Sequence, residues 1–155
     1  MSLVTLETIT TKQSELDKLI QQFKEQALSM TMVYPRVDIE LQPGEHYAGP
    51  VLDASGFIVH HLVLMAQRPT SKLNWQDAMD WATSVGGTLP SRQQQALLYA
   101  NCKPHLKPEW HWSCEQHETE ASFAWECTFS YGGQDDTRKS YEGSAVAVRL
   151  IPITA

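Results

Sequence analysis

Two helical segments joined by a very short connection place the tightest limit on the fold. The first, N-W-Q-D-A-M-D-W-A-T-S-V-G-G, begins with the favoured cap residue Asn74 and ends at two glycines. The second, S-R-Q-Q-Q-A-L-L-Y-A-N-C, begins with Ser91, and Gln94 stands where it completes a capping box. Only the tripeptide T-L-P lies between them. The two helices are therefore expected to form a compact pair.

Strand-like segments lie on both sides of this helical pair. The runs H-Y-A-G-P-V-L and G-F-I-V-H-H-L-V-L-M flank D-A-S-G and predict a hairpin. Pro50 favours an edge position or a bulge for the first strand, whereas apolar residues on both faces favour burial of the second. After the helices, W-H-W-S-C-E, A-S-F-A-W-E-C-T-F and S-A-V-A-V-R-L-I predict more strands, with Y-G-G-Q-D-D as a turn. This order of elements indicates an α+β domain.

A separate amphipathic helix is predicted at the N-terminus, from Ser14 to about Ser29. Ser14 is the expected cap, with Asp17 three residues later. Residues 1–35 are thus interpreted as a helix and linker, and residues 36–155 as the α+β domain. One side of the helix carries an apolar stripe, which predicts either a homo-oligomer or docking on the chain's own domain. The stripe consists of Leu16, Leu19, Ile20, Phe23 and Ala27.

Charge and hydropathy narrow the classes of partner. The 155 residues carry a formal net charge of −6 with no block of lysine or arginine, which disfavours nucleic acid as a partner. No apolar run is long enough to span a bilayer, so no membrane partner is expected. The start of the chain lacks the pattern of a secretory signal. These features predict a cytoplasmic protein, unless a phage particle or a dedicated secretion system carries it out.

From Gly44 to Ile151 the chain resembles a domain-of-unknown-function family common in prophages and bacterial genomes. The resemblance rests on N-W-x-D-A at Asn74, G-G-x-L-P-S-R at Gly86, H-W-S at His111, and A-W, G-G-Q, K-S and A-V-A-V-R further on. It implies a C-type-lectin-like fold, in which two helices brace antiparallel sheets. It also implies kinship with formylglycine-generating enzymes and with receptor-binding domains diversified by retroelements.

Metal and thiol chemistry are weakly indicated. His105, His111 and His117 with Cys114 or Glu115 could be proposed as zinc ligands, but His111 and Cys114 point to opposite faces of a strand. The motifs with which sugar-binding C-type lectins hold calcium are missing. Cys127 alternates with apolar residues and is expected to be a core thiol. No metal, no cofactor and no catalytic residue is therefore predicted.

The leading functional hypothesis is a non-enzymatic binding module of phage or prophage origin, whose ligand is a protein or a surface glycan. The first alternative is a structural or assembly component of a phage particle, and the second is an enzyme of the formylglycine-generating type. The resemblance places ligand contacts in the C-terminal half of the domain, above a core that includes Trp112 and Trp125. The predicted ligand-binding residues are His111, Ser113, Glu115, His117, Glu126, Gln134, Arg138 and Tyr141.

Overall fold

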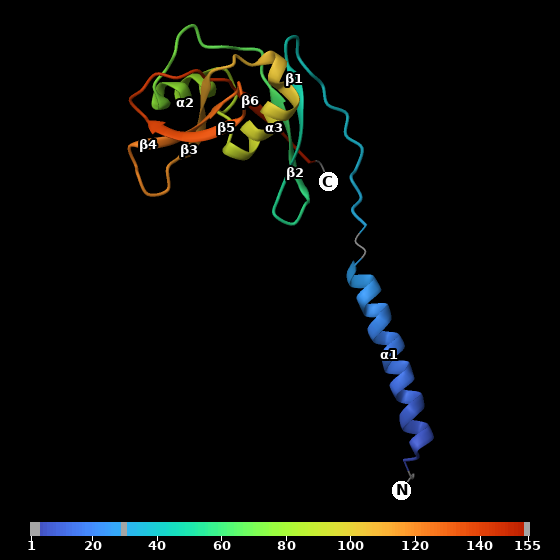
Figure 1. Ribbon diagram of the computed structural model, residues 1–155. Helices are drawn as coiled ribbons and strands as arrows, with labels where there is room; N and C mark the ends of the chain where they lie inside the picture. The colour runs from blue at the N-terminus through green and yellow to red at the C-terminus, as the bar shows by residue number, and fades with distance from the viewer. Residues whose placement is uncertain (1–3, 29–30, 154–155) are drawn as a thin grey trace. The chain divides into compact units, whose positions relative to one another are not determined.

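A computed structural model of the chain describes residues 4–28 and 31–153 (Figure 1). The chain forms two compact units, Met1–Val37 and Asp38–Ala155. The described residues contain three α-helices and two antiparallel sheets of three strands each, so the predicted α+β class is confirmed. No helix in these described ranges is both long enough and apolar enough to cross a membrane.

Unit 1 contains a single described element, helix α1 (Leu6–Leu28). The helix begins before Ser14, because Thr5 caps it: the Thr8 N–H donates to Thr5 Oγ1 at 3.3 Å. The prediction that Ser14 is the cap is therefore wrong, and the predicted end at Ser29 lies outside the described residues. Leu16, Leu19, Ile20 and Phe23 are all exposed, since no other described element of this unit covers them.

The first sheet of unit 2 has the strand order β1-β2-β6. It consists of β1 (His46–Leu52), β2 (Ile58–Leu64) and β6 (Val148–Pro152). The predicted hairpin is confirmed, with Pro50 on the edge strand and β2 in the centre. Asp53 Oδ1 closes the turn by accepting hydrogen bonds from the backbone N–H groups of Ser55 and Phe57.

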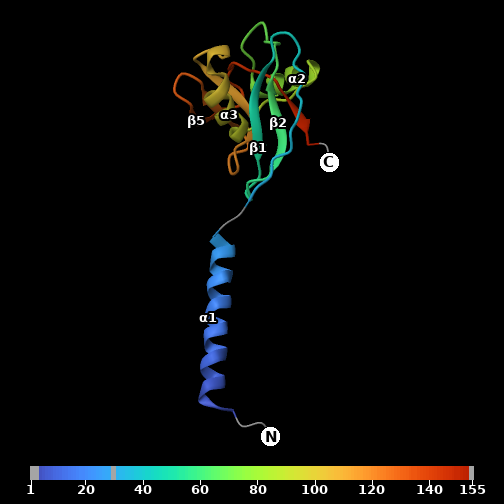
Figure 2. The same ribbon diagram turned by 90° about the vertical axis from the view of Figure 1, so that its right-hand side faces the viewer.

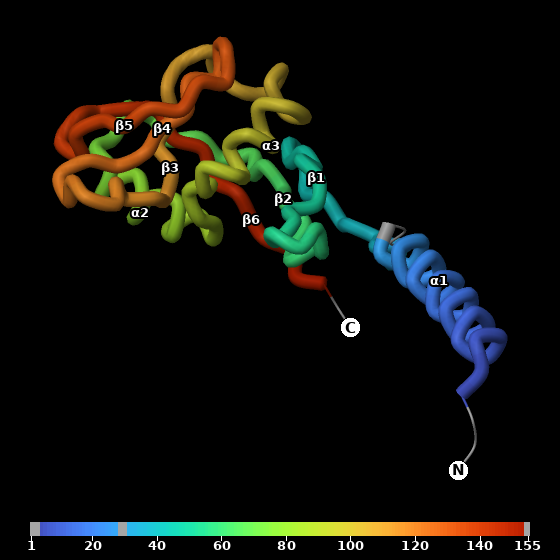
Figure 3. Tube along the Cα trace, turned by 60° about the horizontal axis from the view of Figure 1, so that its bottom comes forward, coloured from blue at the N-terminus to red at the C-terminus, as the bar shows by residue number. Residues whose placement is uncertain are grey.

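The second sheet has the strand order β3-β4-β5. It consists of β3 (Trp110–Gln116), β4 (Phe123–Thr128) and β5 (Gly133–Arg138). The prediction of a turn through Y-G-G-Q-D-D is wrong in its extent. The turn ends at Gly132, which adopts φ 79° and donates its N–H to the Thr128 carbonyl, so Gln134 and the two aspartates belong to β5. Figure 3 shows the two sheets as separate groups of strands.

Helices α2 (Trp75–Ser84) and α3 (Arg92–Cys102) pack against these sheets. Both predicted caps are present: Asn74 accepts from the Asp77 N–H, and Ser91 forms a complete capping box with Gln94. A 3-10 turn, η1 (Lys103–His105), follows α3. Helix α3 lies against β1 (Figure 2) and also contacts β3 and β4.

Strand β3 is covered on both faces by two apolar clusters. One cluster lies towards α3 and contains Leu98, Cys102, Cys127 and Phe129, while the other lies towards α2 and contains Ala78, Ala82, Trp112 and Ala124. Each helix also donates a side-chain hydrogen bond to the β3 backbone. Gln95 Nε2 donates to the His111 carbonyl at 3.0 Å, and Trp75 Nε1 donates to the Ser113 carbonyl at 2.8 Å. The central part of β3 therefore belongs to the interior.

Candidate binding surface

Three of the predicted ligand-binding residues are buried, so their assignment to an exposed surface is wrong. His111, Ser113 and Glu126 expose 2%, 0% and 7% of their area. The prediction assumed that one face of β3 meets water, as in an edge sheet covered on one side. Helices and apolar clusters cover both faces of β3. Alternate side chains along this strand therefore point into two different parts of the core, and neither set points into solvent.

Glu126 lies on the opposite face of β4 from Trp125, and faces Asp135 across the sheet. Burial is the main cause that raises the pKa of Glu126, to about 7, and the charge of Asp135 adds to it. The Thr128 hydroxyl lies at 3.5 Å from Glu126 Oε2. In the described part of the chain no cation pairs with this carboxyl group, so its environment favours the neutral acid.

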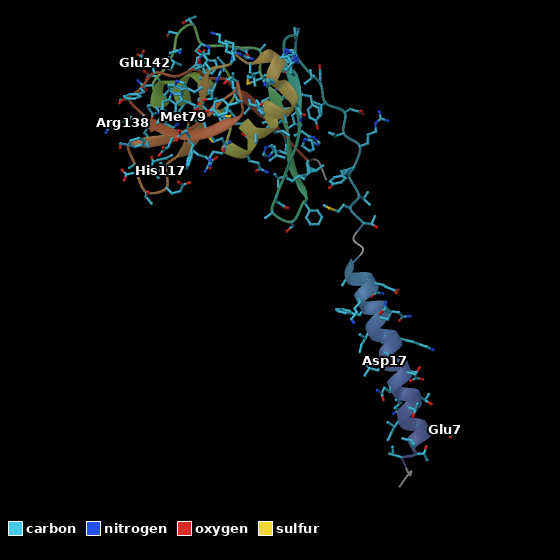
Figure 4. All side chains as sticks on the ribbon, viewed as in Figure 1. Glu7, Asp17, Met79, His117, Arg138 and Glu142 are labelled. Carbon is cyan, nitrogen blue, oxygen red and sulfur yellow. The ribbon has the colours of Figure 1, made fainter. Side chains whose placement is uncertain are left out.

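The other face of β4 brings several predicted residues together. In the β4–β5 register, cross-strand pairs share a face, and three of these pairs lie on the side of Trp125. The pairs are Cys127–Gln134, Trp125–Asp136 and Phe123–Arg138. Glu115 and His117 reach this side from the end of β3, through the contacts described next. Figure 4 labels Arg138, the last residue of β5, and His117, which directly follows β3.

Arg92, the first residue of α3, connects the helix to the sheet. Its guanidinium carbon lies 3.5 Å from the centre of the Trp125 ring, and its Nε donates to Gln134 Oε1 at 3.1 Å. Gln134 returns a hydrogen bond from Nε2 to the Arg92 carbonyl at 2.6 Å, and the Arg92 N–H donates to Glu115 Oε2 at 2.6 Å. Glu115 therefore accepts from one of the N–H groups that the helix start leaves unpaired.

His117 is held in one tautomer beside the same tryptophan. Its ring centroid lies 5.5 Å from that of Trp125, with an angle of 23° between the ring planes. Nδ1 accepts hydrogen bonds from the backbone N–H groups of Thr119 and Glu120, so the ring hydrogen is on Nε2. Nε2 lies 3.4 Å from an oxygen of Asp136. Both heteroatoms of the ring are thus fixed by partners.

We call this set of mutually bonded side chains the Arg92–Trp125 surface. It consists of Arg92, Glu115, His117, Glu118, Trp125, Gln134 and Asp136. Beside it lies an open depression of about 690 Å³, which is lined in part by Arg92, Glu115 and Gln134. Glu115, His117 and Gln134 were predicted for such a surface, whereas Trp125 was predicted to belong to the core and Arg92 was not among the predicted ligand-binding residues.

Arg138 and Tyr141 lie at the margin of this region. Arg138 extends over the Phe123 ring, 5.5 Å from its centre, and the Tyr141 side chain is 59% exposed. In the described ranges neither side chain forms a hydrogen bond to the Arg92–Trp125 surface. They could therefore contact a ligand without holding the surface in place.

The residues considered for metal or thiol chemistry are dispersed. In the described residues, no group of three histidine, cysteine or acidic side chains could hold a metal ion. His105 stacks on His46 with 3.4 Å between ring centroids, and His117 belongs to the Trp125 cluster. All three cysteines are free, and burial raises the pKa of the Cys102, Cys114 and Cys127 thiols.

No protein-family model matches the chain, and no curated protein matches it either.

Proposed function

We propose that this chain is a non-enzymatic binding module and that its ligand contacts the Arg92–Trp125 surface. The observation that carries the proposal is the fixed arrangement around Trp125. Arg92 and His117 both stack on a half-buried indole, and each is held by further hydrogen bonds. Polar groups that are ordered before binding lose less conformational entropy when a ligand arrives.

A protein ligand fits this surface better than a small molecule. Arginine, tryptophan and tyrosine are enriched at the centres of protein interfaces. Here Arg92 and Trp125 are surrounded by acceptors such as Glu118, and the exposed side chain of Tyr131 follows the end of β4. The depression is open and broad, whereas small-molecule sites are enclosed. A surface glycan bound without calcium is the alternative ligand.

The buried positions of the groups considered for catalysis also favour a binding role. The Ser113 hydroxyl is fully buried and accepts the Glu115 N–H at 3.1 Å. Burial, with a smaller contribution from the charge of Glu126, raises the pKa of the Cys127 thiol to about 11. The thiol is therefore a poor nucleophile at neutral pH. We expect a chromogenic thiol reagent at pH 7 to label all three cysteines more slowly in the folded chain than in urea. Rapid labelling of two thiols in the folded chain would favour the enzyme of the formylglycine-generating type.

A selection with matched variants tests the binding proposal. The full-length chain is presented to a random-peptide display library and to a glycan array, beside two variants. Arg92→Lys keeps the charge but loses the planar stack on Trp125, and Glu142→Ala is the control, because Glu142 is exposed and lies outside the surface. We expect peptides that bind the unmodified chain and the control, and that bind Arg92→Lys about tenfold more weakly, a loss of about 1.4 kcal/mol.

Two outcomes would contradict this assignment. If the selected peptides bind the unmodified chain and both variants equally, the ligand contacts another part of the molecule. If glycans bind the unmodified chain and bind Arg92→Lys more weakly, the ligand is a glycan and not a protein. A phage or prophage origin, with a role as binding module or as particle component, rests on the sequence resemblance and enters the proposal on that basis. Gene neighbours that encode tail proteins would support it.

Self-association through α1 is a second proposal. The exposed residues Leu19 and Phe23 lie on one stripe of a helix of 23 residues, which is long enough for a short coiled coil. Sedimentation should give a mass above that of a monomer at micromolar concentration, and Leu19→Glu should return the chain to a monomer. Replacing exposed Lys18 by Glu changes the charge at the neighbouring position and serves as the control.

A further inference from the structure

A second cavity, partly open to solvent, lies away from the Arg92–Trp125 surface. It has a volume of about 400 Å³ and is bounded by the loop after β2, the end of η1, the start of β3 and the segment before β6. Its lining includes three cationic side chains and one carboxylate, and at neutral pH these formal charges sum to +2 when histidine is counted as neutral. The charged residues are Arg68, Lys72, Lys107 and Glu109.

The carboxylate of Glu109 is already satisfied within the protein. Ser144 donates its hydroxyl hydrogen to Glu109 Oε1, and Lys72 Nζ lies 3.3 Å from Glu109 Oε2. These contacts lower the pKa of Glu109, so the group stays ionised near neutral pH. Lys72 and Glu109 therefore offset each other, and Arg68 and Lys107 provide the excess positive charge of the cavity.

Arg68 is held in place by carbonyl groups of the backbone. Its Nη1 donates to the carbonyls of Met65 and Gln67, and its Nη2 donates to the His105 carbonyl at 3.4 Å. A guanidinium carries five N–H hydrogens, so these three bonds leave two for a ligand. The position of the cation is fixed before any anion arrives.

His111 adds a hydrogen-bond acceptor to the lining. The side chain is 98% buried, and its Nδ1 lies 2.8 Å from the Glu109 carbonyl, an atom that can only accept. Nδ1 therefore carries the ring hydrogen, and Nε2 presents a lone pair. Burial lowers the pKa of His111 to about 4, so the ring is neutral at pH 7. In the described part of the chain Nε2 has no hydrogen-bond partner.

We propose that this cavity binds a small hydroxycarboxylate. Arg68 and Lys107 would hold the carboxylate groups, and the ligand hydroxyl would donate its hydrogen to His111 Nε2. A simple carboxylate would satisfy the cations but would offer no hydrogen-bond donor to His111 Nε2, so the hydroxyl group adds a contact that a simple carboxylate lacks. The proposal is independent of the Arg92–Trp125 surface, since the two sets of lining residues share no member.

Malate and succinate are the matched probes, because they differ by one hydroxyl group. Titration calorimetry of the full-length chain at pH 7 should show malate binding about tenfold more tightly than succinate. In His111→Asn the amide can still donate to the Glu109 carbonyl, but the acceptor at the Nε2 position is lost. We expect this variant to bind the two acids equally. His111→Gln, which places an amide oxygen near the Nε2 position, should retain part of the preference for malate.

Lys107→Ala tests the cavity without disturbing the core. Lys107 is exposed, and its removal should weaken malate and succinate equally, by about fivefold, while their ratio stays the same. Arg138→Ala removes one positive charge at the end of β5 and should leave both affinities unchanged. These two variants show whether the acids bind in this cavity, even if the His111 variants do not fold.

Three results would overturn the inference. The first is no binding of malate at millimolar concentration. The second is equal affinity of the unmodified chain for malate and succinate. The third is an equal loss in Lys107→Ala and Arg138→Ala, which would indicate a general charge effect. An NMR titration gives an independent readout, because malate but not succinate should shift the His111 Nε2 resonance.

Discussion

The two sheets of unit 2 use charged residues in different ways. In the β1–β2–β6 sheet, Arg149 of β6 forms a hydrogen-bonded ion pair with Glu45 at 2.7 Å and also donates to the Glu40 carbonyl. In the β3–β4–β5 sheet, Glu126 is buried and has no cationic partner among the described residues, and Arg92 of α3 stacks on Trp125 of this sheet. The first sheet therefore pairs its charges for stability. The second contains Glu126, whose burial as a charged group costs stability, and such a cost is common where proteins bind ligands.

Breaking the ion pair of the first sheet should have the largest effect. Only 6% of the Glu45 side chain is exposed, so Arg149→Ala would leave a buried carboxylate without its main partner. We expect a loss of about 3 kcal/mol in the free energy of unfolding, measured by urea denaturation at pH 7. Arg138→Ala, which removes an exposed arginine, is the control.

The stability that the ion pair of Glu45 and Arg149 contributes should depend on pH. The hydrogen bonds and charge of Arg149 lower the pKa of Glu45. A lowered pKa in the folded state means that the stabilisation is present above the ordinary value of 4.5 and is lost as the pH falls through the folded value. The difference in stability between the unmodified chain and Arg149→Ala should therefore shrink in acid. A constant difference from pH 7 to pH 3 would contradict this assignment.

Replacing the buried acid of the second sheet by a neutral residue should have the next largest effect on the free energy of unfolding, and it should increase stability. The pKa of Glu126 is raised from 4.5 to about 7, so the folded state binds its proton more tightly than the unfolded state. The stability that the protonated Glu126 side chain contributes is fully present below pH 4.5 and is lost as the pH rises to about 7. At pH 8, Glu126→Gln should raise the free energy of unfolding by about 2 kcal/mol. At pH 4 the two proteins should be equally stable.

A matched variant separates the two causes of the raised pKa. Asp135→Asn removes the opposing charge but leaves Glu126 buried, and burial is the larger cause. The gain in stability at pH 8 should therefore be smaller than in Glu126→Gln. A larger gain in Asp135→Asn would show that charge repulsion, and not desolvation, dominates at this position.

Local patterns in the sequence were sufficient to predict most elements of the fold. The caps at Asn74 and Ser91 and the edge position of Pro50 depend on residues next to each other in the chain, and the structure bears them out. The start of α1 and the turn before β5 were wrong for a related reason. Ser14 and the G-G-Q motif are plausible signals, but Thr5 caps the helix and Gly132 alone ends the turn.

The candidate surface was harder to predict because it depends on contacts between distant elements. The alternation of side chains along a strand places His111 and Trp112 on opposite faces of β3, but it could not show that both faces are covered. Arg92 and Trp125 are 33 residues apart in the sequence, and the packing of α3 on β4 brings them together. No local pattern indicates that contact, so Arg92 was not among the predicted ligand-binding residues.

A change within the Arg92–Trp125 surface should have a moderate effect on stability. Arg92→Lys loses the planar stack and the Nε hydrogen bond to Gln134, while the backbone contacts of residue 92 remain. We expect a loss of about 1 kcal/mol in the free energy of unfolding, together with a change in tryptophan fluorescence. The fluorescence is informative because Trp125 is the tryptophan on which Arg92 stacks. A loss as large as that of Arg149→Ala would remove the contrast between the two sheets.

The smallest effect is expected at the margin of the second sheet. The Tyr141 side chain is exposed and forms no hydrogen bond with the described residues, whereas the Tyr141 backbone N–H donates to the Arg138 carbonyl at 2.9 Å. Tyr141→Ala should change the free energy of unfolding by less than about 0.5 kcal/mol, because it leaves no cavity and no unpaired buried group. Any loss of peptide affinity in this variant could then be assigned to direct contact with the ligand. If Tyr141→Ala instead destabilised the chain by more than about 1 kcal/mol, the margin would belong to the packed structure. Tyr141 would then no longer serve as a probe of binding, and Arg92→Lys would carry that test alone.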